Sequence, residues 1–274
     1  MNSEELQKNF ENIKKMYLEE NKSSEEIATF YGVKRYKINY ILKKNNIQKS
    51  FSESRRKYNL DINYFDEIDT PNKAYILGFL YADGYNNRIN NTVVLSLKRE
   101  DEEILEKINT ELKNEKPIYR YDYINNYDGK ERHMSEVIFA SKHMCESLEK
   151  LGVIQNKTFT ITFPNFLKEN LYPHFIRGLF DGDGCASIYN DEDRERFMVS
   201  IMSTKALCDG MKDFLKTQDI NFNVNKACGK KDENALIRSG SNKENKKFME
   251  YIYKDADLYM QRKYERFLTF FKEN

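Results

Sequence analysis

Cysteine, histidine, proline and glycine are all scarce in this 274-residue sequence. The four cysteines form no C-x-x-C pair, and only three histidines are present: His133, His143 and His174. These counts argue against a zinc site, a disulfide framework and any chemistry that needs a histidine cluster, and they favour a reducing compartment. With 11 glycines and 4 prolines, the composition is that of a folded chain with little disorder.

Long apolar runs are also missing. The run ILGFLYA has seven residues and ends in an acid, which is too short to cross a bilayer. The first ten residues, MNSEELQKNF, do not have the pattern of a signal peptide. We therefore expect no membrane partner and no secretion. The expected location is cytoplasmic, in a bacterium or encoded by a phage and associated with the nucleoid, or within an organelle.

The net charge of +1 hides a strongly basic segment. Between Lys34 and Tyr58 there are nine basic residues and one acid, Glu53, so this segment carries a net +8. The basic residues are Lys34, Arg35, Lys37, Lys43, Lys44, Lys49, Arg55, Arg56 and Lys57. A local patch of this kind is typical of a surface that contacts nucleic-acid phosphates. The alternative is a solvated basic helix followed by a linker.

The first 50 residues predict a small helical domain. The apolar residues of segment 4–20 follow a helical spacing: Leu6, Phe10, Ile13, Tyr17 and Leu18. Ser23 or Ser24, with Glu26, can then begin a short helix that runs to Phe30.

A turn at Tyr31-Gly32-Val33 and a second helix from Lys34 to Lys44 follow, with Ile38, Ile41 and Leu42 facing inward. This pattern resembles a helix-turn-helix of the resolvase or sigma-factor kind. Lys34, Arg35 and Lys37 would lie at the N-terminal end of the recognition helix, where such helices meet base edges. A purely structural helical hairpin has similar spacing and remains the alternative.

From about residue 72 the chain repeats itself. In each half, a helix ending in Asp-Gly is followed by two strand-like segments, a helix, two more strand-like segments and a last helix. Each half therefore reads αββαββα, and a repeat with this many matched elements is a stronger prediction than any single element. The strands alternate apolar with polar residues, so helices should cover one face of each sheet and leave the other polar or aromatic.

The open faces of these sheets are candidate DNA-binding surfaces. The basic, hydroxyl and aromatic residues predicted for them are Tyr85, Arg88, Tyr119, Arg120, Tyr121, Ser187, Tyr189 and Arg238. The alternative for the tyrosines is a place in the core or at a sheet edge.

Each repeat begins with a helix that ends on an acid, Asp83 or Asp183. The carbonyl end of a helix is partly negative, so a carboxylate there is unfavourable by itself. Small residues four apart, Gly78 and Ala82 in one helix and Gly178 and Gly182 in the other, allow the two backbones to approach closely. The two acids would then lie together and require a cation, for which Mg²⁺ with substrate phosphate is suitable.

The backbone carbonyls of Ala82 and Gly182 are further candidate metal ligands. The alternative is that each Asp-Gly pair only terminates its helix. The presence of two matched copies argues against that alternative.

The two motifs, ILGFLYADG (Ile76–Gly84) and IRGLFDGDG (Ile176–Gly184), make the chain resemble the single-chain, two-motif form of the LAGLIDADG homing endonuclease family. The resemblance covers roughly residues 71–274. It implies an α+β fold of tandem αββαββα repeats forming a pseudo-twofold saddle, here preceded by a small all-α helix-turn-helix domain. It also implies that Asp83 and Asp183 bind a divalent metal, Mg²⁺ or Mn²⁺, over the cleavage point.

The resemblance further implies a basic residue near each active centre. LGVIQNKT and DLYMQRKY match at this point, so Lys157 and Lys263 are the candidates. Surface lysines without a catalytic role are the alternative. The polar residues that would steer solvent are Glu100 or Asp101, and Ser203 or Thr204. Asp181 replaces Tyr81 at one motif position, and we expect it to be structural.

The sequence therefore predicts a metal-dependent endonuclease that hydrolyses both strands of duplex DNA, working as a monomer on a long asymmetric site. The predicted domains are 1–50 (helix-turn-helix), 51–70 (basic linker), 71–168 (first repeat) and 169–274 (second repeat). A non-cleaving DNA-binding regulator and an RNA-binding splicing helper on the same fold are the alternatives. The presence of both acids favours the nuclease.

Overall fold

The computed structural model describes residues 3–20, 22–47, 57–155, 157, 160–191, 194–227 and 234–273. The chain divides into two compact units, residues 1–59 and 60–274. Arg55 and Arg56, two of the predicted DNA-binding residues, lie outside the described residues.

The first unit is helical around its own small core. Its helices are α1 (Ser3–Lys8), α2 (Phe10–Leu18), α3 (Ser24–Phe30) and α4 (Arg35–Lys44). Ser23 and Glu26 form the predicted capping box at the start of α3, and Gly32 adopts a φ of +63° in the turn before α4. Ile38, Ile41 and Leu42 are buried, as the spacing predicted.

Segment 4–20 differs from its prediction in two ways. The helix is interrupted at Asn9, whose backbone (φ −94°, ψ 13°) departs from the helical conformation, so two short helices replace one. The side-chain amide of Asn9 also donates to the carbonyl of Glu5 at 2.8 Å. Leu18, predicted to face the core, is exposed, and Met16 is buried with Tyr17 instead.

The second unit contains the predicted pair of αββαββα repeats. The first repeat comprises α6 (Pro71–Ala82), β1 (Gly84–Asn87), β2 (Thr92–Lys98), the 3₁₀ turn η1 (Arg99–Asp101), α7 (Glu102–Glu111), β3 (Tyr119–Ile124), β4 (Glu131–Ala140) and α8 (Lys142–Lys150). The second comprises η3 (Glu169–Leu171), α9 (Tyr172–Asp183), β5 (Gly184–Asp191), β6 (Arg194–Thr204), α10 (Lys205–Thr217), β7 (Asn223–Lys226), β8 (Asn234–Ser239) and α11 (Asn242–Tyr253). A final helix, α12 (Gln261–Glu273), follows.

Each repeat has one antiparallel four-stranded sheet, with the orders β1-β2-β4-β3 and β5-β6-β8-β7. Alternate residues point to opposite faces of a sheet, so the buried positions identify the face that the helices cover. In the first sheet this face carries Val93, Leu95, Val137 and Phe139. Val199, Ile201 and Ile237 mark the same face of the second sheet.

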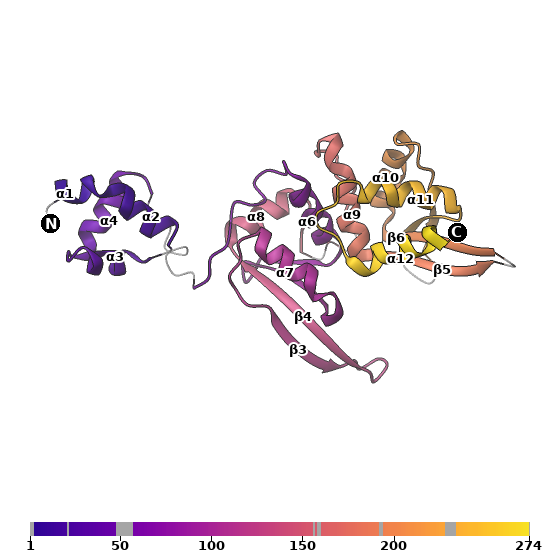
Figure 1. Ribbon diagram of the computed structural model, residues 1–274, viewed down its shortest axis with the longest axis horizontal. Helices are drawn as coiled ribbons and strands as arrows, with labels where there is room; N and C mark the ends of the chain where they lie inside the picture. Colours follow the sequence, from indigo (N-terminus) through magenta and orange to yellow (C-terminus); the bar gives the residue numbers. More distant parts are fainter. Residues whose placement is uncertain are drawn as a thin grey trace. The chain divides into compact units, whose positions relative to one another are not determined.

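Helices α6 and α9 lie side by side in the middle of the second unit (Figure 1). A Cβ atom added to Gly78 would lie 2.0 Å from the carbonyl oxygen of Phe175. One added to Gly178 would lie 1.9 Å from the carbonyl oxygen of Tyr75. The two backbones are therefore in direct contact at these glycines, as the spacing of small residues predicted.

Residues 60–68, expected to form part of a linker, are packed onto the second unit. Leu60, Tyr64, Phe65 and Ile68 are all buried in the core that the two repeats share. The hydroxyl of Tyr64 also donates to Glu111 at 3.1 Å. The segment is thus an N-terminal extension of the first repeat. No helix in the described parts of the chain is both long and apolar enough to cross a membrane.

Candidate active site

The two motif acids lie at the ends of the contacting helices. Asp83 is the C-cap residue of α6, and Asp183 is the last residue of α9. Both are exposed to solvent. A Cβ atom added to Gly182 would lie 2.3 Å from the Cβ of Ala82 and 2.9 Å from Oδ2 of Asp83. The missing side chain at Gly182 thus allows the carboxylate from the other repeat to lie against the end of α9.

Each helix end is capped by one of the predicted lysines. Lys157 Nζ donates to the carbonyl of Ala82 at 3.1 Å and to that of Gly84. Lys263 Nζ donates to the carbonyls of Phe180 (2.7 Å), Asp181 (2.6 Å), Gly182 (3.4 Å) and Gly184 (2.6 Å). An ammonium group stabilises the partly negative carbonyl end of a helix. These lysines therefore supply part of the positive charge that the sequence argument assigned to metal alone.

The charges of the site are coupled across the repeats. Burial lowers the pKa of Lys157, while Asp183 and then Asp83 raise it. Burial likewise lowers the pKa of Lys263 to about 8, with Asp83 among the groups that oppose this shift. Asp83 is exposed as a residue, but the surrounding protein desolvates its carboxyl and raises the pKa of that group. Lys263 and Lys157 oppose this rise.

Two neighbourhoods result. Lys157 and Asp183 line the same hollow, and the pKa of the Asp83 carboxyl is lowered more by Lys263 than by Lys157. Each therefore combines a lysine from one repeat with an acid from the other. We refer to them as the Lys157 centre and the Lys263 centre.

The Lys157 centre opens into a hollow of about 270 Å³. Its lining residues are Tyr81, Ala82, Lys157, Ile161, Asp183, Met202, Ser203 and Asn234. Ser203 is thus the predicted polar residue that reaches this centre. Thr204 instead caps α10 and donates to the carbonyl of Ile161.

The Lys263 centre is more closed. Lys263 is 5% exposed, and Asp101 is close enough to raise the pKa of Asp83. The Arg262 guanidinium donates two hydrogen bonds to the Asp101 carboxylate, from Nε to Oδ1 at 2.7 Å and from a terminal nitrogen to Oδ2 at 3.0 Å. Of the predicted pair Glu100 or Asp101, only Asp101 is in this position, because Glu100 is exposed and pairs with Lys98. Sequence reasoning did not identify Arg262.

Tyr81 and Asp181, which occupy the same position in the two motifs, make similar structural contacts. The hydroxyl of Tyr81 donates to the carbonyl of Leu151, in the loop that leads to Lys157. Asp181 is buried and accepts from Met260 N at 2.8 Å, just before Lys263, and from the hydroxyls of Tyr75 and Tyr253. Each side chain ties a motif helix to the segment that precedes a lysine, so the structure supports a structural role for Asp181.

The donor set suits a hard divalent cation. Two exposed carboxylates and the carbonyls of Ala82 and Gly182 offer oxygen atoms only, which Mg²⁺ and Mn²⁺ prefer. Each carbonyl already accepts one lysine hydrogen bond, which leaves one lone pair for a ligand. Among the described residues, a separate His-carboxylate group, Asp122, Glu131 and His133, lies on β3 and β4. Asp122 there is already paired with Arg99 at 2.6 Å.

Strand parity places most of the predicted saddle residues on the open faces. Tyr85 pairs with Val94, Ser187 with Met198, and Arg238 with Ser200, all opposite to the helix-covered positions. Tyr189, on the same face as Ser187, is 40% exposed. Tyr119, Tyr121 and Tyr123 form a stacked row along β3 on the open face.

Two predicted residues lie on the opposite face. Arg120 pairs across strands with buried Ser135, and its guanidinium binds Glu102 of α7 at 2.8 Å. Arg88 binds Glu146 and Glu149 of α8, each at 3.4 Å. Both arginines thus anchor helices to the first sheet. A one-residue difference in register reverses the face of a strand residue, and the sequence alone did not fix that register.

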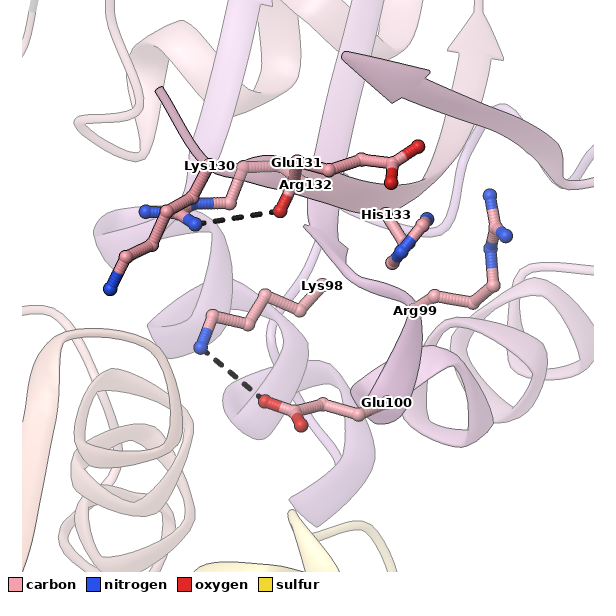
Figure 2. Close-up of a pocket in the computed structure, with 7 residues that line it drawn as sticks. All are labelled: Lys98, Arg99, Glu100, Lys130, Glu131, Arg132 and His133. Atoms are coloured by element: carbon pink, nitrogen blue, oxygen red, sulfur yellow. Dashed lines mark hydrogen bonds and ion pairs between the residues drawn. The ribbon is translucent and has the colours of Figure 1, made fainter. Parts of the chain in front are cut away.

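Other basic residues that sequence reasoning missed gather where β2 ends beside the start of β4. They surround a hollow with a volume of about 600 Å³, and Figure 2 shows the residues around it. Its lining residues are Lys98, Arg99, Glu100, Lys130, Glu131, Arg132 and His133. Lys98 and Arg132 share the open face with the tyrosine row, because Lys98 pairs with Met134 and Arg132 pairs with Tyr123.

In the first unit, the predicted contact residues start α4. Lys34 is the N-cap of this helix and is exposed. Arg35 is held by Ser24 Oγ at 3.2 Å, and Lys37 is partly buried. The most exposed aromatic side chains of α4 are Tyr36 and Tyr40, at 63% and 57%. Lys57, at the end of the basic segment, is exposed.

Comparison with known proteins places the fold. Residues 171–253 match the family model of the LAGLIDADG-like domain. No curated protein matches the sequence. The LAGLIDADG homing endonuclease I-GzeII, solved in complex with a DNA target, superposes with a TM-score of 0.50 at 12% identity, over 75% of this chain and 89% of that one.

Two further solved structures are similar. The I-LtrWI LAGLIDADG homing endonuclease bound to target DNA has a TM-score of 0.48 at 17% identity, over 77% of this chain and 90% of that one. Full-length DUF199/WhiA from Thermatoga maritima has a TM-score of 0.46 at 18% identity, over 76% of this chain and 64% of that one. The LAGLIDADG resemblance and the two-repeat saddle fold are thus confirmed by the domain match and the I-GzeII superposition.

Proposed function

We propose that this protein is a site-specific, metal-dependent endonuclease that cuts both strands of duplex DNA. The observation that supports it best is the pair of exposed aspartates at the ends of two helices in backbone contact, each end capped by a lysine from the last part of its repeat. Because both motif helices belong to one chain, the enzyme would act as a monomer. The two repeats differ in sequence, so the target would be long and asymmetric.

The reaction is hydrolysis of a phosphodiester. The oxygen of a water molecule attacks phosphorus, the bond to O3′ breaks, and O3′ takes a proton while the water loses one to solvent. When bound between Asp83 and Asp183, a Mg²⁺ or Mn²⁺ ion would supply water activation and charge stabilisation. Lys157 and Lys263 would hold fixed positive charge beside the attacked phosphate, since each is tied to helix carbonyls.

The open faces of the two sheets would bind the DNA. On the first sheet we propose Tyr85, the row Tyr119, Tyr121 and Tyr123, and the neighbouring Lys98 and Arg132. On the second we propose Ser187, Tyr189 and Arg238. We do not include Arg88 and Arg120 among the DNA-contacting residues, because both already bind carboxylates on the helix-covered side of the sheet.

The first unit would bind DNA beside the cleavage site. A short helix, a turn with Gly32 and a second helix with exposed lysines agree with a helix-turn-helix. Lys34, Lys37 and Lys57, with Arg55 and Arg56, would contact phosphates. The side chain of Arg35 is held by α3, so Tyr36 and Tyr40 are better placed than Arg35 to reach base edges.

A non-cleaving DNA-binding regulator is the second candidate. One observation favours it: lysine ammonium groups already neutralise both helix ends, so the fold does not require a metal. The third candidate is an RNA-binding splicing helper. It would use the same polar saddle, and it would differ from the other two in binding RNA in preference to duplex DNA.

One experiment separates the three candidates. A pool of duplexes with randomised centres is selected for binding in Ca²⁺, and the enriched sequence is cloned into a supercoiled plasmid. We expect Mg²⁺ to convert this plasmid to linear DNA and EDTA to prevent it. Tight binding without any cut would support the regulator, and binding of structured RNA in preference to every duplex would support the splicing helper.

A further inference from the structure

The two lysine centres are built differently, although the repeats are similar. Lys263 donates to four backbone carbonyls and is buried, whereas Lys157 donates to two and is partly exposed. Lys263 also has Arg262 beside it, and Arg262 is bound to Asp101 of the other repeat. The Lys157 centre instead faces a hollow lined by Ser203 and Asn234.

The difference arises from the residue types at matched positions. Lys98 and Thr204 are the N-caps of the helical segments that follow β2 and β6, so Asp101 in η1 (Arg99–Asp101) corresponds to Leu207 in α10. Leu207 is buried and apolar, so it cannot pair with a guanidinium. The sequence position that matches Arg262 is Asn156, and an amide cannot form a salt bridge with a carboxylate.

The Asp101–Arg262 pair is well placed to fix Lys263. Asp101 is 9% exposed, so its carboxylate is costly unless paired, and the two-pronged contact defines the position of the guanidinium. Arg262 directly precedes Lys263 at the start of α12. Holding Arg262 therefore holds the backbone from which Lys263 reaches the end of α9 and acts on Asp83.

We propose that Asp101 and Arg262 are a positioning pair for the Lys263 centre alone, so that losing the pair converts the enzyme from a double-strand cutter into a nickase. This inference rests on the proposed nuclease function. Neither residue takes part in bond making. Their role is to keep one ammonium group in place, and a displacement of about 1 Å at a reacting centre lowers its rate by up to about a hundredfold.

The test uses the selected duplex in a supercoiled plasmid and measures nicked and linear products over time. We expect R262Q and D101N to make the first cut within about twofold of the wild-type rate and to slow the second by roughly ten- to a hundredfold. Labelling each strand in turn should assign the slow cut to the same strand in both variants. The double variant should be no slower than either single one, because the two residues act as a unit.

R266Q is the matched control, since it removes another guanidinium from α12 that binds the Ala186 carbonyl and does not contact Asp101. R262K should restore part of the second cut, because one ammonium replaces a two-pronged contact. Affinity for the duplex in Ca²⁺ and the melting temperature are measured for every variant. Both should change little relative to the loss of the second cut.

Equal slowing of both strands in R262Q, with a lowered melting temperature, would overturn the inference and leave the pair as a structural link between repeats. Unchanged cutting of both strands would overturn it too. A wild-type protein that binds the duplex but cuts neither strand in Mg²⁺ would instead refute the proposed nuclease.

Discussion

At the scale of single residues, the position of Asp83 and Asp183 is explained by what surrounds the helix ends. Carboxylates at the carbonyl ends of helices are unfavourable, and here Lys157 and Lys263 bind those carbonyls directly. The lysines satisfy the helix ends, and the two carboxylates themselves are exposed. The arrangement therefore separates fold stability from the proposed binding of metal.

The first prediction concerns these acids. Asp83→Asn and Asp183→Asn should each abolish double-strand cleavage in Mg²⁺, because an amide is a poor substitute for an anionic metal ligand. Binding of the selected duplex in Ca²⁺ should survive, since the saddle is unaltered. Plasmid cleavage and a gel-shift titration provide the two measurements.

The matched control is Asp209→Asn, a partly exposed acid of α10 whose carboxylate pairs with Lys205. This variant should cut at the wild-type rate. Full Mg²⁺-dependent cleavage by the Asp83→Asn, Asp183→Asn double variant would remove the metal site from the proposal.

The second prediction concerns pH and His174. Burial lowers the pKa of His174 to about 4, and the neighbouring Arg177 guanidinium, 3.0 Å from Nδ1, acts in the same direction. The unfolded chain binds a proton near pH 6.5, so it holds more protons than the fold between about pH 4 and 6.5. Stability is therefore full above this window and falls as the pH decreases through it, by at most about 1.4 kcal/mol per pH unit.

Urea unfolding of wild type and His174→Gln at several pH values tests this effect. Glutamine keeps an acceptor for Arg177 but does not titrate, so the difference between the two proteins should shrink as the pH falls from 6.5 towards 4. Parallel stability curves for the two proteins would show that His174 is not the group responsible.

At the scale of elements, the sequence predicted what depends on local spacing. The close crossing of α6 and α9 follows from small residues four apart, and the αββαββα order follows from repeated periodicity. The faces of Arg88 and Arg120 did not follow, because they depend on cross-strand register. The Asp101–Arg262 pair joins residues 161 positions apart, so no local pattern could indicate it.

The third prediction concerns the helix crossing. Gly78→Ala or Gly178→Ala should destabilise the fold, because each new Cβ would lie about 2 Å from a carbonyl oxygen of the partner helix. Backbone cannot move aside as a flexible side chain can, so we expect a loss of about 3 kcal/mol or more, at the upper end of overpacking effects. The Leu variants should lose more stability and also separate the two acids.

Alanine is intrinsically favoured over glycine in a helix by about 1 kcal/mol, so a net loss would identify the contact as its cause. Gly240→Ala is the control, because nothing lies within 4 Å of a Cβ there. Its melting temperature should stay close to wild type. Wild-type melting temperatures for both helix variants would show that α6 and α9 do not touch in solution.

At the scale of the whole molecule, the protein has two units with separate cores, and only the second contains the acids. The boundary between them lies after residue 59, because Leu60 and the residues that follow it, up to Ile68, are packed on the repeats. A cut at this boundary should leave the saddle fold intact. It would also remove the whole +8 segment between Lys34 and Tyr58.

The last prediction follows from that division. Deleting residues 1–59 should leave Mg²⁺-dependent cleavage chemistry in place but weaken binding to the selected duplex. Each phosphate contact contributes about −0.9 to the slope of log affinity against log salt. If Lys34, Lys37 and the Arg55–Lys57 cluster make about four such contacts, the slope should become shallower by about 3–4 units, with at least a tenfold loss of affinity at moderate salt.

Salt titrations of both proteins on one long duplex measure this change. Substituting Lys107, a partly exposed residue of α7 paired with Glu103, provides a control for loss of charge outside both proposed surfaces. Equal slopes and equal affinities would mean that the first unit does not bind this DNA, and its helical hairpin would then be structural or serve another partner.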